Sequence, residues 1–162
     1  MIAIVSIERL SKKKNPHLPN LTLIQARNII DASLAKSREL SLSPLTVAVL
    51  DAGGHLIALN REDNSGILRV DIAIGKAWGA LGMGYGSREI FERSKKAPSF
   101  IEALTAASKG RLIPGAGGVL IRDNDNVTMG AVGISGDTSD NDETCAVAGI
   151  ESIGLRPMIG AE

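Results

Sequence analysis

The side chains best suited to acid–base chemistry lie in three separate parts of the 162-residue sequence. Asp51 and Arg61 flank a short apolar run, Lys76 stands in a glycine-rich segment, and acids cluster between Asp140 and Glu143. Such groups can supply charge and move protons in a lyase, isomerase or cyclase that acts on a small organic acid. Lys76 can equally bind a carboxylate as a point charge or form a surface or interface salt bridge. One hypothesis is therefore an enzyme with Lys76, Arg61 and Asp51 as catalytic residues.

Two glycine-containing stretches, residues 114–118 and 135–136, can present backbone N–H groups to an anion, because glycine permits concave backbone geometries. Their candidate ligand-binding residues are Gly115, Gly117, Gly118, Ser135 and Gly136. The first stretch lacks the last glycine of the dinucleotide-binding fingerprint and precedes a predicted strand, not a helix. A tight entry into an edge strand is the alternative interpretation.

The loop after residue 135 is rich in acids that resemble calcium ligands. They are Asp137, Asp140, Asp142 and Glu143. The central glycine and the spacing of an EF-hand are missing, and acids at the start of a helix are favoured by its dipole. We therefore predict structural acids and no metal site. Cys145 follows in the same helix, where its thiol pKa could be lowered, but no His stands beside it, so we predict a buried structural cysteine.

Hydrophobic periodicity predicts five helices that must hold these residues in place. Their predicted spans are residues 23–40, 70–83, 87–96, 99–107 and 141–153. Thr22 with Gln25, and Ser99 with Glu102, have the spacing of capping boxes at two of the starts. The helix over 70–83 contains three glycines that cost about 1 kcal/mol each relative to alanine, which predicts a very close interhelix or intersubunit contact.

Two β-hairpins complete the pattern, over residues 46–60 and 119–134. Asp51–Gly54 and Asp123–Asn126 are their predicted turns. Hairpins require antiparallel pairing, so we predict an α+β fold: an α-β-α sandwich with one antiparallel sheet and helices on its faces. Residues 1–20 form a predicted N-terminal arm or strand with a linker, and residues 21–162 a single domain.

Composition excludes several function classes. Eighteen Lys and Arg balance eighteen Asp and Glu, which gives no electrostatic basis for binding nucleic acid or an anionic membrane. Four aromatic residues are too few for base-stacking platforms. A single cysteine excludes an internal disulfide and favours the cytoplasm, and no apolar run is long enough to span a membrane.

Four sequence blocks carry a resemblance to a known family. They are Val47–Leu56, Ala73–Ala77, Pro114–Val119, and Gly130–Gly136 followed by Asp140–Glu143. In this order they resemble the GlcG/HbpS family, also called the haem-degrading domain family, which includes the C-terminal domain of PduO-type proteins. The resemblance covers residues 22–154. It implies a profilin-like sandwich, homo-oligomers that are often octamers, and small-molecule or haem binding in some members.

Haem requires an axial donor in an apolar slot. The candidate donors are His17, His55, Met83, Tyr85, Met129 and Cys145. His55 directly follows a turn, so we expect it to face solvent or cap the hairpin. His17 lies in the basic linker, from which an arm can deliver a ligand across a subunit interface.

The sequence departs from the family pattern after the first hairpin, where Glu62–Gly66 replaces a Met-Asp-Gly-Ala type of segment. The favoured hypothesis is a GlcG/HbpS-type protein that acts as a homo-oligomer and binds a small ligand, either haem or a small carboxylate, with His17, His55 and the two glycine stretches as candidate contacts. A module that serves only in assembly is a third possibility.

Overall fold

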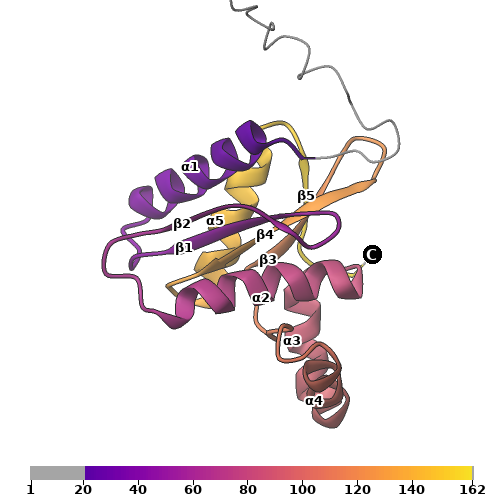
Figure 1. Ribbon diagram of the computed structural model, residues 1–162. Coiled ribbons are helices and arrows are strands. Elements are labelled where there is room, and N and C mark those ends of the chain that lie inside the picture. The colour runs from indigo at the N-terminus through magenta and orange to yellow at the C-terminus, as the bar shows by residue number, and fades with distance from the viewer. Residues whose placement is uncertain (1–20, 162) are drawn as a thin grey trace, which may run out of the picture.

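The centre of the molecule is a five-stranded sheet, seen in a computed structural model that describes residues 21–161 (Figure 1). Its strands are β1 (Thr46–Asp51), β2 (Leu56–Arg61), β3 (Gly118–Arg122), β4 (Thr128–Ser135) and β5 (Arg156–Met158). They are ordered β2-β1-β4-β3-β5, and every neighbouring pair is antiparallel. The two predicted hairpins are thus joined through β1 and β4.

Helices cover both faces of this sheet. They are α1 (Leu23–Glu39), α2 (Leu68–Met83), α3 (Ser87–Lys96), α4 (Pro98–Ala107) and α5 (Ser139–Glu151). The helices α1 and α5 pack together on one face, and α2 lies on the other (Figure 1). The helices α3 and α4 follow α2 and extend away from the sheet (Figure 1). The predicted α+β class, with one antiparallel sheet between helices, is confirmed.

The two faces of the sheet are built from side chains of different size. Large aliphatic residues such as Val47, Ile121 and Ile134 fill the side that meets α1 and α5. On the α2 side, a Cβ at Gly133 would overlap the carbonyl oxygen of Ala73 in α2. The backbone of α2 therefore lies directly on the sheet, because glycine leaves room for this approach.

Some element boundaries differ from the sequence predictions. The prediction of a capping box at Ser99 is wrong. Helix α4 begins at Pro98 and has no side-chain cap, and proline at the first helical position already has a helical φ. The last helix begins at Ser139, two residues before the predicted start, with Thr138 as its cap. The sequence does not predict the short strand β5, because three residues are too few to show an alternation of apolar and polar side chains. The capping box at Thr22 is confirmed.

The glycines of α2 have three different environments. A Cβ on Gly75 would lie 2.8 Å from the carbonyl oxygen of Arg111, so this glycine does allow a backbone approach. A Cβ on Gly79 would meet side chains of the same chain, at 3.2 Å from Leu112. A Cβ on Gly82 would have one neighbour within 4 Å, the ring of Trp78 at 3.8 Å. The close contacts found at Gly75 and Gly79 are therefore within the chain.

Candidate functional site

The turn between β1 and β2 holds an ordered carboxylate–imidazole pair. Oδ1 of Asp51 accepts hydrogen bonds from the backbone N–H groups of Gly53 and His55, each at 2.9 Å. The same oxygen lies 3.2 Å from Nδ1 of His55. The side chain of His55 is 81% exposed. The expectation that His55 faces solvent agrees with this placement.

Two small hollows that share Trp78 and Gly82 lie beside this turn and along α2, and the second is mostly apolar. Gly53, Gly54, Trp78 and Gly82 line a hollow of about 150 Å³. Trp78 and Gly82 also line a second hollow, of about 230 Å³, which Met83 borders. We call the two together the Trp78 trough. No side chain at positions 53, 54 or 82 narrows it, since all three are glycines.

One cation lies on the indole of the Trp78 trough. The guanidinium carbon of Arg111 lies 4.0 Å from the centroid of the Trp78 ring, the geometry of a cation–π contact. On another side, a Cβ at Gly54 would lie 3.1 Å from the edge of the same ring. The trough therefore has an aromatic wall and aliphatic neighbours, and Arg111, which does not line either hollow, lies against the same indole.

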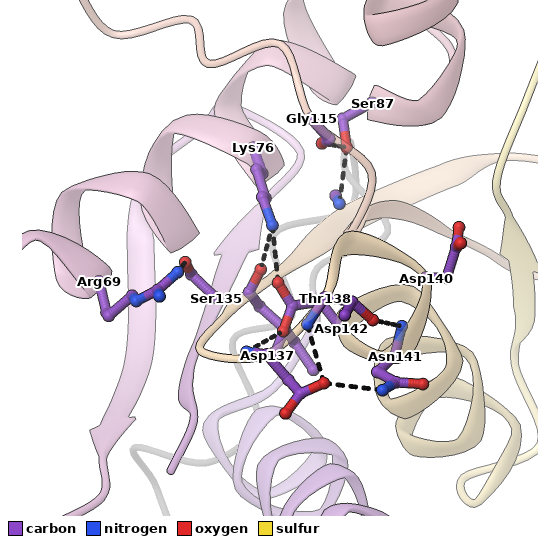
Figure 2. A network of polar contacts seen from close by, with 12 residues as sticks. Arg69, Lys76, Ser87, Gly115, Ser135, Asp137, Thr138, Asp140, Asn141 and Asp142 are labelled. Atoms are coloured by element: carbon purple, nitrogen blue, oxygen red, sulfur yellow. Dashed lines mark hydrogen bonds and ion pairs between the residues drawn. The ribbon is translucent and has the colours of Figure 1, made fainter. Parts of the chain in front are cut away.

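Lys76 is not a surface residue but part of a buried ion pair. Its Nζ donates to Oδ2 of Asp142 at 2.8 Å and to the carbonyl oxygen of Ile134 at 2.9 Å (Figure 2). Its side chain is 5% exposed and that of Asp142 is 1% exposed. Burial raises the pKa of Asp142, and the ammonium of Lys76 opposes that rise. The pair joins α2 to α5 around the end of β4.

The left-handed backbone of Gly117 lies directly against the ion pair of Lys76 and Asp142. Gly117 has φ of +109° and accepts a hydrogen bond from the N–H of Ile134. The carbonyl oxygen of Ile134 accepts a hydrogen bond from Nζ of Lys76. A Cβ on Gly117 would lie 3.1 Å from Nζ of Lys76 and 2.9 Å from Cβ of Asp142. Glycine is therefore required here for packing.

The other predicted glycine contacts are also filled by the protein itself. A Cβ on Gly118 would overlap the carbonyl oxygen of Lys76, and one on Gly136 would overlap that of Pro44. The carbonyl oxygen of Gly115 accepts from the hydroxyl of Ser87 at 2.6 Å, which in turn accepts from N–H of Gly118 at 2.7 Å (Figure 2). This packing favours a tight structural entry into β3, but the prediction of an edge strand is wrong, because β3 lies between β4 and β5. Ligand binding at these glycines stays a prediction.

Ser135, the remaining member of the two glycine stretches, also has a partner within the chain. Its hydroxyl accepts from Nη1 of Arg69 at 3.2 Å (Figure 2). It lies at the end of β4, close to the ion pair of Lys76.

The acids around the start of α5 are held by structural partners within the chain. Arg88 donates to Asp140 at 2.5 Å and to Oε1 of Glu143 at 2.8 Å. Asp137 accepts from the side chain of Asn141, and hydrogen bonds of this kind hold the pKa of Asp137 well below its usual range. Burial raises the pKa of Glu143, whose Oε2 has no hydrogen bond to the described residues. Between residues 21 and 161 no group of three or more His, Cys, Asp or Glu is arranged to hold a metal ion.

The three predicted catalytic residues do not meet in one site. Arg61 pairs with Thr46 at the start of β1 and donates to the carbonyl oxygen of Ser65 at 2.5 Å. Asp51 stands at the other end of β1, beside His55. Lys76 is near the Arg61 end of the sheet but is enclosed by its own partners. None of the four hollows described for residues 21–161 is lined by all three.

The candidate haem ligands differ in accessibility. Cys145 is fully buried in the core between the sheet, α1 and α5, and burial raises the pKa of its thiol to about 11. Met129 packs against the same core. The hydroxyl of Tyr85 is buried without a hydrogen-bond partner among the described residues. Met83 borders the Trp78 trough, and His17 lies outside the described residues.

Two further hollows contain none of these donors. A groove of about 610 Å³ runs along α4, where Pro98, Ile101 and Pro114 line it. A polar hollow of about 520 Å³ lies beside Arg38, Arg61 and Glu62. Neither is lined by a His, Met, Tyr or Cys side chain.

Sequence reasoning missed two parts of the site. Trp78 and Arg111 meet only because the segment after α4 returns to α2, at the contact made possible by Gly75. The positions of Trp78 and Arg111 in the sequence give no sign of this contact. The single tryptophan of the chain, placed among glycines, was the one available hint.

Known proteins resemble this chain over most of its length. An uncharacterised 15.0 kDa protein from the dhaT-dhaS intergenic region of Citrobacter freundii is 28% identical over 138 residues, which cover 85% of this chain and 95% of that protein. The crystal structure of protein ORFY from Klebsiella pneumoniae matches with a TM-score of 0.75 at 28% identity, covering 83% of this chain and 90% of that one. A crystal structure of a PduOC:haem complex matches equally well, with a TM-score of 0.75 at 23% identity and coverage of 84% and 96%.

Residues 21–151 match the family described as haem-degrading protein HbpS-like. That match extends over most of the chain and contains strands β1 to β4 and all five helices, while β5 lies beyond it. It includes the Asp51–His55 turn and the residues of the Trp78 trough. The chain belongs to the HbpS-like family.

Proposed function

We propose that this protein binds haem in the Trp78 trough and does so as a homo-oligomer. The observation that carries the proposal is the family match over residues 21–151, to proteins described as haem-degrading. A solved relative of the same fold contains haem. The binding of a small carboxylate instead of haem is the competing outcome.

The residues of the trough fit a planar apolar ligand with acidic side groups. Glycines at positions 53, 54 and 82 leave the indole of Trp78 accessible from the trough. Arg111 supplies a positive charge for a carboxylate such as a haem propionate. Met83 lines the trough and carries a thioether donor that haem iron accepts, and His55 lies in the turn whose Gly53 and Gly54 line the trough. Bound haem would supply an iron centre for redox or oxygen chemistry.

The openness of the trough supports the homo-oligomeric part of the proposal. Neither hollow reaches the roughly 300–1,000 Å³ that usually enclose a ligand, so haem held there would keep one face uncovered. A second subunit would cover that face. Ile67 and Leu68, which are 87% and 66% exposed, are apolar side chains available for subunit contacts. An octamer is the specific assembly we expect.

Haem titration of the purified full-length chain tests the proposal. We expect a saturable Soret band with one haem per subunit, and a mass by light scattering above that of the 16.9 kDa monomer. Gly82→Leu should weaken binding because its side chain enters the trough, whereas Ala35→Leu adds the same kind of apolar bulk on α1 and should not. A featureless, non-saturating titration would contradict haem binding.

An enzyme acting on a small organic acid remains the second candidate, supported by one observation. Oε2 of Glu143 is buried and lacks a hydrogen bond among the described residues, and burial raises the pKa of this carboxyl group. A carboxyl of this kind can transfer a proton. Turnover of a small acid that is lost in Glu143→Gln would favour the enzyme, and turnover that survives would exclude Glu143. No helix of residues 21–161 is long and apolar enough to cross a membrane, and we keep a cytoplasmic location as part of the proposal.

A further inference from the structure

We infer that the groove along α4 binds a small organic cation, a molecule with an apolar body and an ammonium group that donates to Glu102. The groove has a volume of about 610 Å³, which lies within the roughly 300–1,000 Å³ of ligand sites in general. It shares no lining residue with the Trp78 trough, so the inference goes beyond the proposed haem binding.

The body of the groove is apolar and is left uncovered by the rest of the described chain. Ile101 is the buried residue of α4 and is 4% exposed, while Pro98, Ala106 and Pro114 supply further apolar lining. Among the described helices and strands, α4 contacts only α3, and both extend away from the sheet (Figure 1). An apolar molecule can therefore reach the groove from solvent without displacing another element.

The backbone wall at residues 110–114 has no N–H group left for a ligand. The N–H groups of residues 110–113 all donate within the chain, and their acceptors are the carbonyl oxygens of Thr105, Ser108 and Gly75 and Oγ of Ser108. Pro114 and Pro98 have no N–H, because both are prolines. This wall therefore cannot donate hydrogen bonds to an anion.

The two hydroxyl groups that line the groove also have their protons committed. Oγ of Ser94 donates to the carbonyl oxygen of Phe91 at 2.7 Å. Oγ1 of Thr105 donates to the carbonyl oxygen of Ile101 at 3.0 Å. The lone pairs that remain on these oxygens can only accept.

Glu102 is the one charged side chain of the lining, and the structure gives it no hydrogen bond or ion pair to another described residue. The polar groups of the groove are thus acceptors without donors, and their net charge is negative. An ammonium group on an apolar body matches both properties, because it donates charge-assisted hydrogen bonds to a carboxylate. A carboxylate ligand would find no donor here and would be repelled by Glu102.

Three compounds that share an alkyl chain test this charge preference: octylammonium, octanol and octanoate. We would titrate each into the purified full-length chain by calorimetry, below its micelle concentration, and locate binding by backbone amide NMR. Octylammonium should bind saturably, with shifts confined to residues 94–114. Octanol should bind about fivefold more weakly, the factor expected for one accessible ion pair, and octanoate should not bind.

Two matched pairs of variants test the residues. Glu102→Gln should weaken octylammonium binding about fivefold, whereas Asp31→Asn, which removes an exposed carboxylate of α1, should leave it unchanged. Ala106→Leu fills the groove and should abolish binding. Ala103→Leu adds the same bulk at an exposed position of α4 that does not line the groove, and binding should persist.

Several results would overturn the inference. They are the absence of saturable octylammonium binding, octanoate binding of equal strength, an equal loss in Glu102→Gln and Asp31→Asn, and full binding by Ala106→Leu. Each of these leaves the proposed function standing, because haem binding is measured separately. Haem titration of Ala106→Leu should match that of the wild type, and a loss of haem binding in this variant would contradict a separate site.

Discussion

Lys76→Met removes the positive member of the buried pair while keeping most of the side-chain volume. The variant leaves Asp142, 1% exposed, without its ammonium partner, and leaves the carbonyl oxygen of Ile134 without its 2.9 Å donor. Removal of one partner from a buried ion pair typically costs about 3–5 kcal/mol. We expect a loss of this size in the free energy of unfolding.

The loss should depend on pH in a defined direction. Burial already raises the pKa of Asp142, and removal of Lys76 raises it further. Protonation in the folded state can therefore relieve part of the cost in acid. A carboxyl with a raised folded pKa destabilises the fold increasingly as pH rises above its unfolded pKa, so the variant should lose more stability at pH 8 than at pH 5.

Urea unfolding at one fixed protein concentration, at pH 5 and pH 8, measures these differences. Lys95→Met is the matched control, because Lys95 pairs with Glu92 at 2.7 Å on the surface of α3 and such pairs contribute about 0–1 kcal/mol. The double variant Lys76→Met/Asp142→Asn should recover part of the loss, since it removes the uncompensated charge. A loss below about 1 kcal/mol at pH 8, or no recovery in the double variant, would refute a structural role for the pair.

Three other predictions concern packing and titration. Gly133→Ala should destabilise by about 3 kcal/mol or more in thermal unfolding, because its Cβ would overlap the carbonyl oxygen of Ala73, whereas Gly82→Ala should stabilise by about 0.5–1 kcal/mol. The thiol of Cys145, with its pKa raised to about 11 and no exposure, should react with a disulfide reagent at pH 8 only as fast as the chain unfolds; rapid labelling would contradict its place in the core. Asp137 has a lowered pKa, so its contribution to stability is complete above the usual pKa of an aspartate and is lost in acid; acid titration of Asp137→Asn should show a smaller loss below pH 4 than the wild type.

Much of the fold was predictable because local signals and tertiary packing agree. Alternating apolar residues and the turns at Asp51–Gly54 and Asp123–Asn126 are enough for both hairpins. The capping box at Thr22 marks the start of α1. Strand β5 depends on pairing with β3 more than on its own three residues, so no local pattern could reveal it.

The candidate site was less predictable because it depends on contacts between distant segments. Sequence distance gave no sign that Lys76 and Asp142 pair across the end of β4, since the contact requires the backbone of Gly117. The contact of Arg111 with Trp78 likewise forms because the segment after α4 packs against α2. The Asp51–His55 pair is the exception, because a four-residue separation across a turn is a local feature.

The glycine contact between α2 and the sheet has a consequence for how this protein can vary. Gly133 and Gly118 leave no volume between the helix backbone and the strands, whereas the layer under α1 and α5 contains exchangeable aliphatic volume. In a saturation library, the α1 side should accept many combinations of Val, Ile and Leu. On the α2 side, Gly133 and Gly118 should accept almost no substitution, so variation there would be limited to larger side chains such as Leu50 and Leu120, and the close approach of α2 to the sheet would be inherited nearly unchanged.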